Sequence, residues 1–222
     1  MSETARMKRK VSSIDRLLEK AYGPPPPQRR SDPLGQLIAT ILSQNTNDTN
    51  SHRAFVAMRK AFPTWEAVRD APMDDLVRVL KPGGLAKTKA GRIQRILRSI
   101  SADGALSLDD LKRLPSDGVE RRLLAYDGVG YKTARCVLVF ALGRDAFPID
   151  THVLRVLKRL AVIPERMSAD RAHEFVPQFI PEGRAYAFHV NLIAHGRALC
   201  HPRNPECARC PVKRYCAFID GE

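Results

Sequence analysis

The stretch "YDGVGYKTA", residues 126–134, decides the fold that we expect for this chain. Gly128 and Gly130 can take a positive φ angle at no steric cost, and they leave the backbone bare for a close approach. The amide groups of the turn and of the helix that follows would form a positively polarised pocket for one phosphate, whatever the base sequence. A Gly-x-Gly segment between helices can also be only a turn, so both interpretations stay open from this stretch alone.

Lys132 stands early in the helix that we expect after this turn. A lysine at such a position is most often a solvated surface residue. As a nucleophile it would have to be unprotonated, which burial, a positive neighbour or the positive end of its own helix favours. Asp127 is harder to place, because a carboxylate beside a phosphate site lowers the affinity unless it points away.

Amphipathic helical patterns extend outward from this stretch. An N-terminal pattern from Val11 to Ala21 stops at "GPPPPQRR", residues 23–30, because consecutive prolines cannot continue a helix and form an extended linker. The long alternations and β-branched runs of a sheet are absent from the sequence, so we expect an all-α fold. Further helices are predicted near residues 33–43, 47–61, 64–70, 73–80, 87–102, 107–113, 116–125 and 131–142.

The composition favours a polyanionic partner. The chain has 37 Lys and Arg against 24 Asp and Glu, with a formal net charge of +13. Nucleic acid is the first candidate, although a generally basic protein would show the same balance. No run reaches the roughly 18 to 20 apolar residues of a membrane span, and the N-terminus lacks the apolar stretch of a secretory signal. We therefore expect a cytoplasmic, nucleoid-associated monomer with no membrane partner.

Asp150 directly precedes the helical pattern of "THVLRVLKRL". An aspartate at this place is most simply an N-cap that accepts hydrogen bonds from free helix amides. A capping carboxylate is also held rigidly, as a catalytic carboxylate must be. One helix and the reversing loop "GRDAFP" separate it from Lys132, so the chain can bring both groups to one cleft. His152 fits a packed or supporting histidine better than a metal ligand or a base.

Four of the five cysteines follow the spacing C-x6-C-x2-C-x5-C near the C-terminus. Thiols stay reduced in the cytosol, so such a set indicates metal ligands before disulfides. Four thiolates on a short, turned segment can surround a tetrahedral zinc ion or a [4Fe-4S] cluster, and the single close pair favours the cluster. Cys136 lies in the apolar "CVLVFAL" and fits the core. The four spaced residues are Cys200, Cys207, Cys210 and Cys216.

Three motifs in this order resemble the endonuclease III family of helix-hairpin-helix DNA glycosylases with a C-terminal iron-sulfur cluster: "GVGYKTA", "IDTHV" and the four-cysteine spacing. The resemblance implies two helical domains that flank a DNA-binding cleft. One is a six-helix barrel over residues 33–147, with the helix-hairpin-helix at about 116–142. The other is a discontinuous cluster domain of residues 1–32 and 148–222. The resemblance also favours [4Fe-4S] over zinc at the four cysteines.

The family's catalytic roles carry over to matching positions. Lys132 is implied to be the amine that attacks C1′ of a flipped nucleotide, and Asp150 the carboxylate that stabilises the positive charge developing there. Gly128, Val129 and Gly130 would hold a phosphate. The resemblance therefore implies a bifunctional glycosylase and AP lyase that acts on damaged double-stranded DNA and removes oxidised pyrimidines by Schiff-base formation and β-elimination. Asp127 departs from the proline that the helix-hairpin-helix pattern usually has.

Further DNA contacts are implied in three loops. Leu85 in "PGGLAK" matches the family's wedge residue, Gln44 and Asn45 in "LSQNTND" would fill the gap left by the flipped nucleotide, and Arg203 would reach a phosphate. The pair Gln44-Asn45 departs from the family's best-studied pattern and is closer to relatives that act on mismatches, yet those relatives replace the lysine by serine or tyrosine. The alternatives are a monofunctional mismatch glycosylase for uracil or thymine opposite guanine, and a non-catalytic DNA-binding protein.

Overall fold

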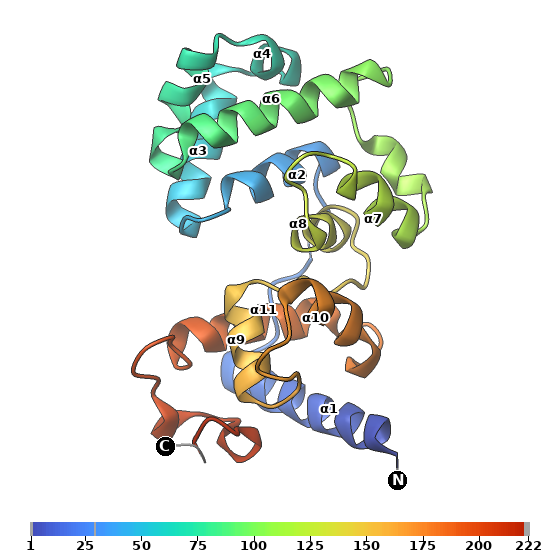
Figure 1. The fold of residues 1–222 in the computed structure, drawn as a ribbon, viewed down its shortest axis with the longest axis vertical. Helices are drawn as coiled ribbons and strands as arrows, with labels where there is room; N and C mark the ends of the chain where they lie inside the picture. The colour runs from blue at the N-terminus through green and yellow to red at the C-terminus, as the bar shows by residue number, and fades with distance from the viewer. Residues whose placement is uncertain (1, 29, 220–222) are drawn as a thin grey trace. The chain divides into compact units, whose positions relative to one another are not determined.

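The computed structural model describes residues 2–28 and 30–219, and every regular element in these two ranges is a helix. The expected all-α fold is confirmed. The chain divides into two compact units, Met1–Gln28 with Asp145–Glu222, and Arg29–Arg144. Figure 1 shows the helices of both units. The barrel and cluster domains with the boundaries given above stay a prediction.

The unit of residues 29–144 is organised around α2 (Pro33–Leu42). The carboxylate of Asp32 caps this helix by accepting the N–H groups of Leu34 and Gly35 at 3.1 and 2.8 Å. Seven of the ten residues of α2 are buried, and it packs against α3, α6 and α8, as a helix that is apolar on most sides must. The other helices of this unit are α3 (Asp48–Ala61), α4 (Trp65–Asp70), α5 (Met73–Leu80), η1 (Lys81–Gly83), α6 (Ala86–Ala102), η2 (Asp109–Arg113), α7 (Ser116–Leu124), α8 (Tyr131–Cys136) and η3 (Val137–Ala141).

The long helix α6 packs against α4 and α5 (Figure 1). Its buried residues Ile93, Ile96, Leu97 and Ile100 follow the i, i+3, i+4, i+7 spacing of a single helical face. Gln94, also buried, donates to the carbonyl groups of Val68 and Ala71 at 3.2 and 2.8 Å. This amide satisfies carbonyl groups at the end of α4 that have no partner within that helix.

Two predicted helices of this unit differ from the structure. The segment predicted at 131–142 is α-helical only to Cys136 and continues as the π-helix η3, in which the Leu142 N–H donates to the Val137 carbonyl group at 3.1 Å. The i→i−5 hydrogen bond makes this turn wider than an α-helical turn. The segment predicted at 107–113 is the 3-10 helix η2, because Pro115 prevents a longer helix.

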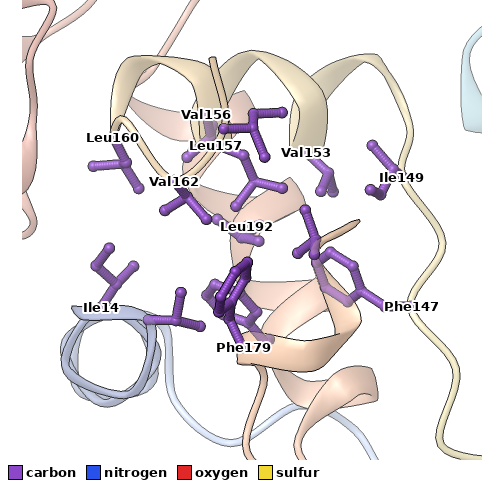
Figure 2. Packing of buried hydrophobic residues seen from close by; sticks show 14 of the residues in the cluster. Ile14, Phe147, Ile149, Val153, Val156, Leu157, Leu160, Val162, Phe179 and Leu192 are labelled. Atoms are coloured by element: carbon purple, nitrogen blue, oxygen red, sulfur yellow. The ribbon is translucent and has the colours of Figure 1, made fainter. Parts of the chain in front are cut away.

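The second unit has one hydrophobic core, shown in Figure 2. Helix α11 packs against α1 and α9. Residues from these helices, from the segments on both sides of α9, from α10 and η4, and Val212 form the core. Figure 2 shows Ile14 of α1 together with Leu192 of α11 and several residues of α9. The helices of this unit are α1 (Glu3–Tyr22), α9 (Thr151–Arg159), α10 (Ala169–Phe175), η4 (Pro177–Phe179), α11 (Ala185–Ala198), η5 (Cys207–Arg209) and η6 (Lys213–Tyr215).

A charged pair joins α1 to the start of α11. Asp15 is only 2% exposed, and Arg184 donates to its carboxylate from Nε and Nη2 at 2.7 and 3.2 Å. Arg184 also donates to Glu19 at 3.0 Å, and the hydrogen bond to Asp15 raises the pKa of the guanidinium. Removal of one partner would leave a buried charge uncompensated, at a cost of about 3 to 5 kcal/mol. The pair therefore fastens the N-terminal helix to the C-terminal half of the chain.

Candidate functional site

The turn between α7 and α8 has one glycine in the left-handed region. Gly128 has φ 74°, and a Cβ atom there would lie 1.9 Å from Nε of Arg92. Gly130 has an ordinary φ of −100°, with nothing within 4 Å of a Cβ added to it. Val129 closes the turn, since its N–H donates to the Tyr126 carbonyl group at 3.1 Å. Gly128 is therefore favoured by the positive φ of the turn, and Arg92 would have to move to admit a side chain there, whereas Gly130 leaves the backbone open toward solvent.

Lys132 is the second residue of α8. Its side chain is half-buried and makes no hydrogen bond or ion pair with any residue that the structure describes. Cys136, the last residue of α8, is buried, as expected for a core residue. The amine of Lys132 thus stands directly after the glycine turn, with its donor capacity available to a bound molecule.

Asp127 is paired with Arg95 of α6. Nη2 and Nε of Arg95 both donate to the same carboxylate oxygen, at 2.7 and 3.1 Å. The hydrogen bond from Arg95 lowers the pKa of Asp127. The pair is exposed, so it contributes little to stability. Its consequence is electrostatic, because the carboxylate that stands where a phosphate is expected is offset by a guanidinium from another helix.

Gln44 connects the predicted DNA-contacting turn to the hairpin. Its Oε1 accepts from Nη1 of Arg92 at 2.7 Å, and its Nε2 donates to the Gly128 carbonyl group at 3.4 Å. The next residue, Asn45, has φ 51°, a conformation that non-glycine residues rarely adopt. Gln44 and Gly128, predicted separately from two motifs, therefore lie in hydrogen-bonding contact.

Leu85 stands at the start of α6 in a strained turn. It has φ 48° and follows Gly84, which has φ 67°. Its side chain is 56% exposed, the highest value among the large apolar residues that the structure describes. Backbone strain costs about 1 to 3 kcal/mol and persists only where the surroundings impose it, often at sites that bind ligands. Leu85 thus combines strain with exposure of an apolar side chain.

Lys89 connects the turn of Gln44 with the turn of Leu85 by hydrogen bonds. This role was not predicted from the sequence. Lys89 is 2% exposed, and its Nζ donates to the carbonyl groups of Leu42 and Gly83, each at 2.7 Å. Leu42 ends α2 just before the turn of Gln44, and Gly83 lies just before the turn of Leu85. Burial lowers the pKa of Lys89. Lys89 lies at a position of α6 where the helical spacing calls for an apolar residue, and this could have indicated a buried amine with hydrogen-bond partners, because a buried cation needs them.

Asp150 lies in the other unit and caps α9, as predicted. Its Oδ1 accepts the Val153 N–H at 2.8 Å, and the residue is half-buried. His152 is packed against α11, because a Cβ at Gly196 would come within 3.0 Å of it, and its Nδ1 lies 3.2 Å from Nη2 of Arg155. The local prediction of a cap is confirmed, and so is that of a packed histidine. Lys132 and Asp150 belong to different units.

The four C-terminal cysteines line one cavity, together with Arg159 and His195. Nη1 of Arg159 donates to Sγ of Cys200 at 3.3 Å, and Nε2 of His195 lies 3.7 Å from Sγ of Cys210. The guanidinium of Arg159 suits a thiolate ligand, because its positive charge offsets the negative charge of the sulfur. No three His, Cys, Asp or Glu side chains within residues 2–28 and 30–219 converge as they would around a single metal ion. The donor set and its surroundings fit an iron-sulfur cluster.

The loop between Cys200 and Cys207 carries Arg203. It is closed by the Glu206 N–H, which donates to the Leu199 carbonyl group at 2.9 Å. Arg203 is exposed, and Asn204 beside it has φ 50°. Asn45, Leu85 and Asn204 are thus three of the four non-glycine residues with positive φ in the described part of the chain. All three lie in loops that the sequence predicts to contact DNA.

Comparison with known proteins identifies the family of this chain. Residues 38–182 match the HhH-GPD superfamily of base excision DNA repair proteins. Endonuclease III of Thermotoga maritima is 31% identical over 94% of this chain and 92% of its own length. A protein of Arabidopsis thaliana that bears a DNA glycosylase name is 34% identical over 74% of this chain, which spans 56% of that longer protein. A solved endonuclease III–DNA complex has a TM-score of 0.82 at 26% identity and covers 96% of this chain and 97% of its own.

The chain therefore belongs to the HhH-GPD superfamily of base excision DNA repair proteins and, within it, to the endonuclease III family. It is an enzyme of the class that comprises DNA glycosylases and AP lyases, and its partner is DNA. The described residues include no helix that is both long and apolar enough to span a membrane.

Proposed function

We propose that this glycosylase also has AP lyase activity and removes oxidised pyrimidines from double-stranded DNA. The observation that carries the proposal is Lys132, a half-buried amine on the second position of α8 that bonds to no described residue. An enzyme that releases a base by activating water needs no amine at this place, whereas covalent catalysis does.

In the proposed reaction, the nucleotide is first extruded from the duplex, at a cost of a few kcal/mol that a weakly paired lesion lowers. Nζ of Lys132 then forms a bond to C1′ while the bond from C1′ to the base nitrogen breaks. The electron pair of the broken bond leaves with the base, which takes up a proton. Asp150 stabilises the positive charge on the sugar as it develops. Opening of the sugar ring gives a Schiff base, and loss of a C2′ proton expels the 3′ phosphate oxygen, which nicks the strand.

The proposed DNA contacts draw on the strained and open turns. Gly128, Val129 and Gly130 would hold one phosphate, in a contact that ignores base sequence. The amides of Gly128 and Gly130 would face the phosphate, while the Val129 N–H closes the turn on the Tyr126 carbonyl group. Leu85 would enter the base stack, and Gln44 with Asn45 would occupy the gap. The exposed side chain and strained backbone of Leu85 support its role, since such strain is often found at sites that bind ligands. Asn45 is exposed in the same turn as Gln44 and tolerates its positive φ.

The four cysteines are proposed to hold a [4Fe-4S] cluster, with Arg159 and His195 beside the thiolates. When bound, the cluster would supply a structural crosslink of the C-terminal segment, and the proposed chemistry needs no redox step from it. Arg203, exposed on the loop between the first two cysteines, would contact a phosphate. The brown colour and visible absorption of the purified protein would distinguish the cluster from zinc. We also propose that the protein acts as a monomer in the cytoplasm, in association with the nucleoid.

Borohydride reduction tests the lyase assignment directly. It should trap a covalent complex of the protein with abasic or thymine-glycol duplex, and Lys132→Ala should abolish the trapped species while DNA binding persists. Absence of trapping by the wild type on both substrates would disprove the lyase activity.

The second candidate, a monofunctional mismatch glycosylase, is favoured only by the pair Gln44-Asn45. It predicts that base release from uracil or thymine opposite guanine outruns strand nicking by a wide margin. A panel of oxidised pyrimidines, mismatches and abasic sites, assayed for base release and nicking in parallel, decides between the two.

A further inference from the structure

Two buried histidines hold the two residues that precede Asp150. His173 of α10 is 1% exposed, and its Nε2 accepts the Ile149 N–H at 2.9 Å. His189 of α11 is 3% exposed, and its Nδ1 lies 2.9 Å from the carbonyl oxygen of Pro148. The reaction proposed above uses neither histidine.

The hydrogen bonds define the protonation of His173. Its Nδ1 lies 2.8 Å from the carbonyl oxygen of Ala169, which can only accept, so Nδ1 carries the hydrogen. The Ile149 N–H can only donate, so Nε2 carries a lone pair. The ring is therefore neutral, and it links the backbone of α10 to the residue next to Asp150. His189 likewise donates from Nδ1, because the Pro148 carbonyl group can only accept.

The segment between the histidines and Asp150 is locked in the core. Phe147 is buried and stacks on Phe188 with ring centroids 5.6 Å apart, and its ring meets that of His189 edge-on at 6.2 Å. Figure 2 shows Phe147 and Ile149 beside Val153 in the core of this unit. Asp150 follows at once and is fixed on its other side by the cap of α9.

We propose that His173 and His189 are positioning residues that set the place of the Asp150 carboxylate for the reaction. This inference rests on the proposed role of Asp150. Catalytic groups must be held within about 0.5 Å of their productive position, and a displacement of about 1 Å can cost roughly a hundredfold in rate. Because the hydrogen-bonded atoms belong to the two residues directly before Asp150, a loss of either bond is transmitted to the carboxylate within one or two residues.

A matched pair of substitutions at His173 separates this role from plain packing. In His173→Gln the side-chain amide reaches as far as Nε2 and keeps an acceptor for the Ile149 N–H. In His173→Asn the amide reaches only as far as Nδ1, so this acceptor is lost although the residue stays polar. Val162→Ala is the stability control, because Val162 lies in the same core but away from Ile149 and Phe147 in Figure 2.

The measurements use the full, cluster-loaded chain on thymine-glycol duplex. They are the single-turnover rate of base release at saturating enzyme, the Kd for a duplex with a tetrahydrofuran abasic analogue, and the melting temperature. His173→Asn should lower the rate by about tenfold to a hundredfold with Kd changed less than about threefold. His173→Gln should recover most of the rate, and Val162→Ala should keep it at any temperature where it stays folded.

A double substitution shows whether the histidine acts through the carboxylate. In an Asp150→Asn background, His173→Asn should cause little further loss of rate, because the group that it positions is already gone. Equal rates for His173→Asn and His173→Gln, or the same loss in both backgrounds, would overturn the inference. A wild-type rate for Asp150→Asn would instead overturn the proposed function itself, so the two failures are distinguishable.

Discussion

The predicted site residues of the two units are held in different ways. In the unit of residues 29–144, Asn45 and Leu85 are exposed residues with positive φ in two turns. The cationic side chains of Lys89 and Arg92 hold these turns by hydrogen bonds. In the other unit, Asp150 starts a regular helix over a dense apolar core. Groups that must enter a duplex need exposure and a fixed, unusual backbone, whereas a carboxylate that only stabilises charge needs an invariant place.

The largest effect should come from the atoms that make and stabilise the bond to the sugar. Lys132→Ala should remove the borohydride-trapped complex and lower nicking by on the order of a thousandfold or more, because the nucleophile is lost. Asp150→Asn should slow formation of the trapped complex but still allow it, since the amine remains. Gel quantification of trapped complex over time provides the measurement. Equal and complete loss in both variants would contradict this division of roles between the units.

Gly128→Ala should be the most destabilising change in the hairpin. The new Cβ would meet Arg92 at 1.9 Å, and the residue would need φ 74°. We expect a loss of about 2 to 4 kcal/mol in the free energy of unfolding, from strain and displacement of Arg92. Gly130→Ala is the matched control, with open space and an ordinary φ, and should change it by less than about 0.5 kcal/mol. Urea unfolding of both variants checks this, and equal losses would refute the assigned difference.

Lys89→Met should cost about 1 to 3 kcal/mol, since two buried carbonyl groups lose their donor. The exposed Lys87→Met nearby should be close to neutral. Burial lowers the pKa of Lys89 below that of the unfolded chain, so near that pKa the unfolded state binds more protons. The contribution of this lysine to stability should therefore rise with pH, and the deficit of Lys89→Met should grow as pH increases. A deficit that shrinks as pH rises in unfolding curves would contradict the lowered pKa of Lys89 in the folded state.

Asp127→Asn should give the smallest effect. The salt bridge to Arg95 is exposed, so only a slight loss of stability is expected at neutral pH. The pKa of Asp127 is lowered in the folded state, so its contribution is present above the unfolded pKa and is lost as pH falls through the folded one. The freed guanidinium should tighten DNA binding at low salt and lose this advantage as salt rises. Fluorescence anisotropy at two salt concentrations measures this, and unchanged affinity at low salt would contradict it.

Local patterns predicted much of this molecule. The helical spacing predicted both ends of the α-helices α2 to α7 within one residue, but it gave no bounds for α10 and α11. The cap at Asp150 could be predicted from its own sequence neighbours. The partner of Asp127 lies 32 residues away, and one of the two carbonyl groups on Lys89 lies 47 residues away, so neither could be found by spacing. The wider turn of η3 was also missed, because the apolar spacing of residues 131–142 is the same for an α-helix and for an α-helix that ends in a π-turn. Contacts between residues far apart in the chain could therefore not be predicted, whereas local helix and cap preferences could.

The ion pair of Asp15 with Arg184 also constrains when α1 can complete its packing during synthesis of the chain. The two residues are 169 positions apart, with the whole of residues 29–144 between them. At synthesis rates of about 5 to 20 residues per second, α1 leaves the ribosome on the order of ten seconds or more before its arginine exists. The uninterrupted segment 29–144 can fold first. Until the C-terminal half is made, the apolar face of the N-terminal helix stays exposed to solvent. A nascent chain halted before Arg184 should therefore be the form of this protein that chaperones hold longest.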